Sequence, residues 1–98
     1  MAQEVRWTEQ AEFTFEKVIT YLEENWSEKE VEYFISASFK VIDFIAEYPK
    51  MFRATDLKNI HEAIVTEHNL LIYKVNKHNI DLITFWDTRQ SKRKRRKK

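Results

Sequence analysis

The stretch IHEAIV-TEHN-LLIYKV-NKHN-IDLITFW, residues 60–86, holds three short apolar segments separated by two polar connections that contain Asn. After Pro49 the apolar pattern changes from a helical period to an alternation of two residues, which indicates strands. Connections this short force neighbouring strands to run antiparallel. We therefore predict an antiparallel three-strand meander of Ile60–Val65, Leu70–Val75 and Ile80–Trp86, preceded by a connector at residues 56–59.

A first amphipathic helix is predicted upstream, at residues 9–25. Its apolar residues recur at helical spacings on one face, and Thr8 can cap the amides that follow it. The members of this apolar face are Ala11, Phe15, Val18, Leu22 and Trp26.

A second helix is predicted to begin at Ser27-Glu28-Lys29-Glu30, which has the capping-box pattern. In that pattern the Ser27 hydroxyl accepts a hydrogen bond from a helical amide, and Glu30 reaches back to the Ser27 amide. Pro49 ends the helix because its ring disfavours helical geometry at Tyr48. The connection between the helices is short, so we expect an antiparallel helical hairpin.

A short strand at Glu4–Trp7 is expected before the hairpin, because polar and apolar residues alternate there. The fold class is therefore α+β, with an N-terminal strand, a helical hairpin and a three-strand meander. One face of the sheet packs on the hairpin, and the other is left for a partner or substrate. Alternate side chains of the last strand are expected to face opposite sides of the sheet. One side has Ile80, Leu82, Thr84 and Trp86, and the other has Asp81, Ile83, Phe85 and Asp87.

The composition excludes several classes of chemistry. The chain has no cysteine, so it has no disulfide, thiol nucleophile or thiolate metal site, and it has no glycine for a phosphate-binding loop. His61, His68 and His78 do not have the spacing of metal ligands on one element, so we expect neither metal nor cofactor. No apolar run approaches the length of a membrane span, and no signal peptide is seen, so a cytoplasmic location is expected.

The small net charge of +1 conceals an acidic body and a basic tail. Residues 92–98 hold seven of the 17 basic side chains, which leaves ten basic against 16 acidic side chains in residues 1–91, a formal charge of −6. A run of like charges repels itself, so we expect a disordered tail at residues 91–98. The residues expected to contact nucleic acid or another target are Lys92, Arg93, Lys94, Arg95 and Arg96. The alternative is a solvated terminus that contacts nothing specific.

The order of these elements resembles the RelE/ParE toxin superfamily. The resemblance rests on the hairpin that ends at Tyr48-Pro49, on Leu71-Ile72-Tyr73-Lys74-Val75, and on the sequence Phe85-Trp86-Asp87-Thr88-Arg89-Gln90. It spans residues 4–90 and implies a single domain at residues 1–90 with the order β-α-α-β-β-β. Members of this superfamily are small bacterial toxins of type II toxin–antitoxin systems, each neutralised by an antitoxin that is encoded beside it.

The resemblance leaves two cellular targets open. Ribonucleases of the RelE branch cut mRNA on the ribosome without a metal, and on this chain their basic positions correspond to His61 and Arg89, our catalytic candidates. The strand arginine of that branch falls at Leu70, and its late tyrosine falls in the basic tail, so part of the catalytic set is missing. The simpler interpretations are that His61 is an exposed imidazole and that Arg89 forms a surface ion pair with Asp87.

The ParE branch inhibits DNA gyrase and lacks the ribonuclease residues, as this chain does. We therefore favour a ParE-like inhibitor, and whether the chain is an enzyme at all depends on this choice. A ribosome-dependent endoribonuclease is the first alternative, and a non-toxic nucleic-acid-binding accessory protein is the second. The expected partners are a cognate antitoxin and either DNA gyrase or the ribosome with its mRNA.

The antitoxin is expected to dock on an apolar strip that the hairpin and the sheet leave exposed. Phe13, Tyr21 and Tyr33 lie off the main apolar faces of the two predicted helices and are the candidate contacts. Partial burial of these three by neighbouring long side chains is the alternative.

Overall fold

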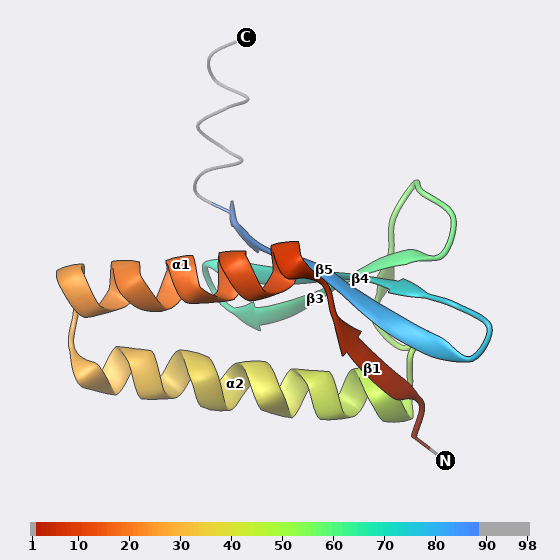
Figure 1. Cartoon of the computed structure of the whole chain (residues 1–98), viewed down its shortest axis with the longest axis horizontal. Helices are drawn as coiled ribbons and strands as arrows, with labels where there is room; N and C mark the ends of the chain where they lie inside the picture. Colours follow the sequence, from red (N-terminus) through yellow and green to blue (C-terminus); the bar gives the residue numbers. More distant parts are fainter. Residues whose placement is uncertain (1, 89–98) are drawn as a thin grey trace, which may run out of the picture.

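The computed structural model describes residues 2–88 and shows a helical hairpin packed against one twisted sheet (Figure 1). The helices are α1 (Glu9–Asn25) and α2 (Glu28–Glu47). The strands are β1 (Glu4–Trp7), β2 (Arg53–Ala54), β3 (Ile60–Thr66), β4 (Asn69–Val75) and β5 (Asn79–Asp87). The predicted α+β class, the hairpin and the three-strand meander are confirmed.

The sheet has five strands in the order β1-β5-β4-β3-β2, more than the meander alone. β3, β4 and β5 pair antiparallel, whereas β1 lies parallel to β5 at one edge. β2 extends the other edge by pairing Arg53 with Glu62 and Ala54 with His61. We did not predict β2, because two residues are too few to show an alternating pattern.

The two helices begin in different ways. The Thr8 hydroxyl accepts a hydrogen bond from the Ala11 amide (3.1 Å) and donates one to the Leu82 carbonyl oxygen (2.7 Å), so it caps α1 and ties it to β5. The predicted capping hydrogen bond at α2 is wrong. Ser27 is the N-cap residue, but its side chain makes no capping hydrogen bond. The Ser27 carbonyl instead accepts from the amides of Glu30 and Val31, as any residue at this position can.

A bulge in β5 changes which side chains of that strand face the core, so the predicted orientation is wrong beyond the bulge. Ile72 pairs with Thr84 and Tyr73 pairs with Leu82, so Ile83 is an extra residue without a partner in this register. Beyond the bulge the alternation is reversed, and Phe85 is buried on the core side whereas Trp86 is only half-buried. Strict alternation would have placed Trp86 there.

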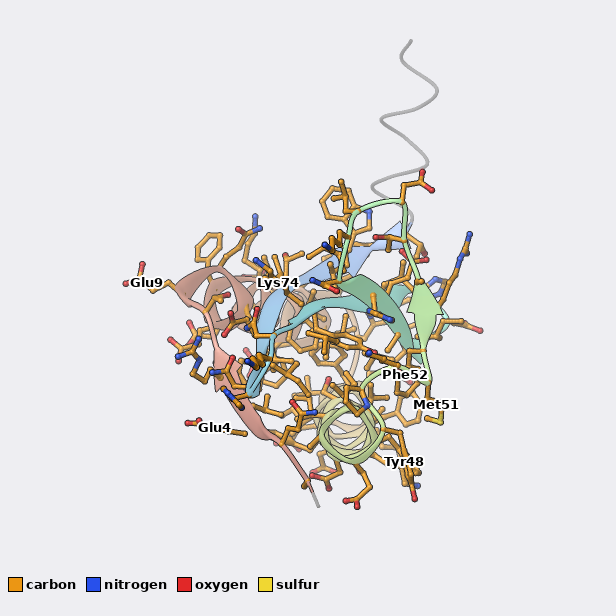
Figure 2. The ribbon with its side chains drawn as sticks, turned by 90° about the vertical axis from the view of Figure 1, so that its right-hand side faces the viewer. Glu4, Glu9, Tyr48, Met51, Phe52 and Lys74 are labelled. Carbon is orange, nitrogen blue, oxygen red and sulfur yellow. The ribbon has the colours of Figure 1, made fainter. Side chains whose placement is uncertain are left out.

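The helices cover one face of the sheet. The core of the described residues includes Ala11 and Phe34 from the helices together with Leu71, Tyr73 and Leu82 from the strands. Viewed along the helices, the sheet curves over α2 and side chains fill the space between them (Figure 2). On the opposite face Ile64 is 70% exposed. No helix in residues 2–88 has the length and apolar character needed to cross a membrane.

Removal of each N-cap hydroxyl tests the difference between the two helix starts. Thr8→Ala is expected to lower the free energy of unfolding by about 1–2 kcal/mol, because the Ala11 amide and the Leu82 carbonyl both lose a partner. Ser27→Ala is the matched control and is expected to change it by less than about 0.5 kcal/mol. Chemical denaturation monitored by circular dichroism measures both, and equal losses would contradict the assignment.

Candidate functional site

A groove runs between the helical hairpin and the sheet, and we call it the helix groove. It consists of two hollows of about 320 and 460 Å³ that share Leu22 and Asn69 as lining residues. The first lies between α1 and the end of β5, and the second lies between the hairpin turn and the β3–β4 turn. Because the hollows share two lining residues, they lie next to each other along the groove.

One ridge of α1 borders the first hollow. Phe13, Lys17 and Tyr21 follow one another at intervals of four residues, so they lie on one side of the helix. Phe13 is 60% exposed, and the Lys17 ammonium lies 5.5 Å from the centre of its ring. Trp86, turned to this position by the β5 bulge, lines the same hollow from the sheet. The groove therefore offers aromatic surface from both of its walls.

The second hollow is bordered by Trp26 and Tyr33, each of which is 60% exposed. Trp26 was predicted to continue the buried face of α1, but it is the C-cap residue of that helix and its side chain is exposed. Helical spacing alone gave no sign of this, because the spacing continues through the residue at which the helix ends. The predicted contacts Phe13, Tyr21 and Tyr33 all line the groove.

The helices that form the groove are strongly acidic. α1 and α2 together contain ten acidic and three basic side chains, a formal charge of −7. Glu30 and Glu67 line the second hollow beside the two aromatic residues. The surface around the groove thus combines exposed aromatic side chains with negative charge, and it suits an apolar partner segment with basic flanks.

His61 lies on the helix-covered face of the sheet, because it pairs with Tyr73, whose side chain is buried there. Its ring stacks on the Tyr73 ring, with centres 5.5 Å apart and planes 22° apart. Its Nδ1 is buried and has no hydrogen-bond partner among the described residues. Leu70 pairs with Ile64, so it faces the other side of the sheet. His61 and Leu70 therefore do not converge on one side of the sheet.

The Tyr73 hydroxyl ties the sheet to the connection that follows α2. It donates a 2.7 Å hydrogen bond to the Pro49 carbonyl oxygen, and the ring packs edge-on against Phe52. Burial raises the pKa of Tyr73 from 10.0 to about 12, because the phenolate is poorly solvated there. Tyr73 is thus a neutral structural donor.

Other predicted site residues lie outside the described residues. These are Arg89 and the tail contacts Lys92, Arg93, Lys94, Arg95 and Arg96, as well as the tail boundary at residue 91. Within residues 2–88, no group of three or more His, Asp or Glu side chains is arranged to hold a metal ion.

Comparison with known protein families identifies one match over most of the chain. Residues 5–92 match the family described as ParE toxin of type II toxin-antitoxin system, parDE. A search of curated proteins gave no match.

Three solved structures share this fold, and two of them belong to toxin–antitoxin systems. A chain of the chromosomal ParDE system from P. aeruginosa superposes with a TM-score of 0.75 at 7% identity, covering 88% of this chain and 96% of that chain. The YoeB dimer from Staphylococcus aureus gives 0.58 at 12% identity, covering 86% and 94%. The E. coli DinJ–YafQ complex gives 0.61 at 8% identity, covering 92% and 97%. At such low identities these similarities show a shared fold.

Alkaline titration tests the environment of Tyr73. Among the four tyrosines of the chain, one phenolate is expected to form with a pKa of about 12 and to be missing in Tyr73→Phe. Because the unfolded chain ionises near pH 10, this group leaves stability unchanged below that pH and lowers it as the pH rises toward 12. Ultraviolet absorbance of phenolate, followed alongside unfolding, measures both effects. A titration that is unaltered in Tyr73→Phe would show that this phenol is not buried.

Proposed function

This chain belongs to the ParE toxin family of type II toxin–antitoxin systems, and from that membership we propose that it inhibits DNA gyrase by binding and is neutralised by a co-encoded antitoxin. The family membership covers residues 5–92, and the fold is that of a chain from a ParDE system. The choice of target rests on the sheet, where the alternative ribonuclease would need its catalytic groups.

The observation that carries the proposal is the separation of the two sheet positions that correspond to ribonuclease residues. In-line cleavage of RNA needs a base, an acid and cations that converge on one phosphate. His61 stacks on Tyr73 on the helix side, whereas Leu70 is apolar and faces the opposite side. A phosphate bound at either face would meet only one of these two positions. This arrangement supports a toxin that acts by binding.

The helix groove is the proposed docking site of the antitoxin. Exposed aromatic residues line both hollows, and such anchors supply much of the binding energy at protein interfaces. An amphipathic segment can place its apolar side chains against Phe13, Tyr33 and Trp86. The charge of −7 on α1 and α2 favours basic residues along the flanks of that segment.

Target identity is tested with purified toxin. Added to DNA gyrase in a supercoiling assay, it is expected to inhibit in a dose-dependent manner, and a molar excess of the co-encoded antitoxin should restore supercoiling. After brief induction in bacteria, primer extension is expected to show intact transcripts beside signs of DNA damage. Transcripts cut in phase with codons, together with unaffected supercoiling, would reject the gyrase proposal and identify a ribonuclease.

Docking in the helix groove is tested with two tyrosines of similar exposure. Tyr33 is 60% exposed in the groove, and Tyr48 is 55% exposed at the far end of α2. Tyr33→Ala is expected to weaken antitoxin binding by about tenfold or more, because it removes an aromatic anchor. Tyr48→Ala is expected to change it by less than about twofold. Calorimetric titration with the co-encoded antitoxin measures both, and equal effects would place the antitoxin elsewhere.

A further inference from the structure

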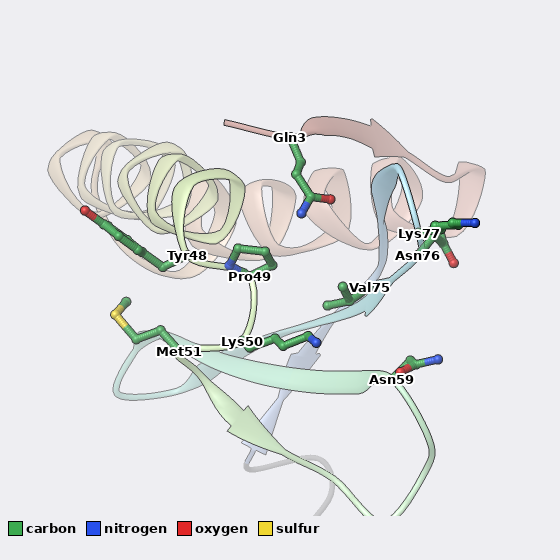
Figure 3. Close-up of a pocket in the computed structure, with 9 residues that line it drawn as sticks. All are labelled: Gln3, Tyr48, Pro49, Lys50, Met51, Asn59, Val75, Asn76 and Lys77. Carbon is green, nitrogen blue, oxygen red and sulfur yellow. The ribbon is translucent and has the colours of Figure 1, made fainter. Parts of the chain in front are cut away.

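A separate pocket of about 840 Å³ lies at the end of the molecule opposite the hairpin turn (Figure 3). Four segments form its wall: the residue before β1, the connection after α2, the residue before β3, and the end of β4 with the β4–β5 turn. It shares no lining residue with the helix groove, and the length of α2, about 30 Å, lies between it and the second hollow of that groove.

Hydrogen bonds from several lining residues hold the wall of the pocket in place. The Pro49 carbonyl accepts from the Tyr73 hydroxyl (2.7 Å), and the Asn59 carbonyl accepts from the Val75 amide (2.8 Å). Asn59 has φ 66°, an uncommon conformation for a residue other than glycine, and this hydrogen bond helps to fix it. The Asn76 side chain donates to Asn79 and to Asp81. The wall is therefore pre-formed.

Gln3 leaves an unmet hydrogen-bonding group in the pocket. Its backbone amide donates to the Ala46 carbonyl (3.0 Å), but its side-chain Oε1 is buried and has no partner among the described residues. Figure 3 shows the Gln3 amide pointing into the pocket. An unpaired buried carbonyl oxygen is costly, and a ligand that brings an N–H or O–H group removes that cost.

The charge of the pocket is opposite to that of the body. Lys50 and Lys77 line it, neither takes part in an ion pair among the described residues, and no Asp or Glu belongs to the lining. Figure 3 shows the Lys50 side chain along the floor of the hollow, and Lys77 at the rim with its ammonium directed outward. Two cations without carboxylate partners attract an anion on a chain whose residues 1–91 have a formal charge of −6.

The adjacent end of α2 does not cancel this attraction. A helix C-terminus repels anions through its free carbonyl oxygens. Here the Ala46 carbonyl accepts from the Gln3 amide (3.0 Å), and the Tyr48 carbonyl accepts from the Met51 amide (3.1 Å). Two of the last carbonyls of the helix are thus already paired.

We propose that this pocket binds a small organic phosphate of the nucleotide class, with the phosphate attracted to Lys50 in the hollow and to Lys77 at the rim, and a donor group of the base on Gln3. Lysine ammonium groups are point charges that suit a phosphate, whereas a carboxylate is better matched by the planar fork of an arginine, which the lining lacks. Pro49, Met51 and Val75 provide apolar surface for the base. The phosphate belongs either to a free nucleotide or to the end of a nucleic acid strand.

Titration of the full chain with adenosine monophosphate tests the site by nuclear magnetic resonance. Saturable shifts are expected for the backbone amides around Val75 and for the Gln3 side-chain amide. Lys50→Gln with Lys77→Gln is expected to weaken binding by about tenfold or more. Lys29→Gln with Lys40→Gln is the matched control, because it removes two lysines from α2 and leaves the basic tail unchanged, and it should stay within about twofold.

Three further measurements distinguish the outcomes. Inorganic phosphate and adenosine are each expected to bind more weakly than the monophosphate, because each supplies only half of the recognised groups. A 5′-phosphorylated oligonucleotide that competes with the monophosphate would identify a strand end as the source, and failure to compete would identify the free nucleotide. Equal weakening in both double variants, or shifts that never saturate, would overturn the proposal. If Lys50→Gln with Lys77→Gln fails to fold, Gln3→Leu replaces it, with the same loss expected.

Discussion

The hydroxyl of Thr14 on α1 accepts a hydrogen bond from the Phe85 amide (3.0 Å) where β5 leaves its regular pairing with β4. An amide displaced from a ladder by a bulge needs a substitute partner, and the helix supplies it. Held in this way, Phe85 turns inward, and its ring lies within 6 Å of the rings of Trp7, Phe15 and Phe34. The same reversal places Trp86 in the wall of the helix groove. One irregularity thus determines both the aromatic core and part of the outer surface.

Sequence periodicity predicted most of the fold, because burial of one side of each helix and strand leaves a repeating pattern. It failed where geometry depends on a distant segment. The β5 bulge requires Thr14, 71 residues away, and the parallel pairing of Val5 with Ile80 joins segments on either side of the hairpin. Ser27 and Thr8 are similar N-cap residues in sequence, yet only Thr8 lies where its hydroxyl also reaches a strand carbonyl. Local patterns contain no information on such neighbours.

Some of the proposed functional surfaces could be predicted from the sequence, and others could not. Phe13, Tyr21 and Tyr33 stood off the apolar faces of their helices, so their exposure followed from helical spacing. Trp86 did not, because its side depends on the bulge. The lysine-lined pocket had no sequence signal at all: Gln3, Lys50 and Lys77 come from three distant segments, and none has a motif around it. The stacking of His61 on Tyr73 likewise appears only once the register of β3 against β4 is fixed.

The two ends of α2 have surfaces of opposite chemistry, and this separates the two proposed kinds of binding. The hairpin end combines Trp26 and Tyr33 with Glu30, whereas the far end combines Lys50 and Lys77 with amide side chains. At about 30 Å the direct electrostatic coupling between them is screened at physiological salt, where the Debye length is about 8 Å. Any mutual influence must therefore pass through a structural element that contacts both sites. Such coupling would require α2 or the sheet to shift as a unit against a close-packed core, so occupancy of one site is compatible with a free second site.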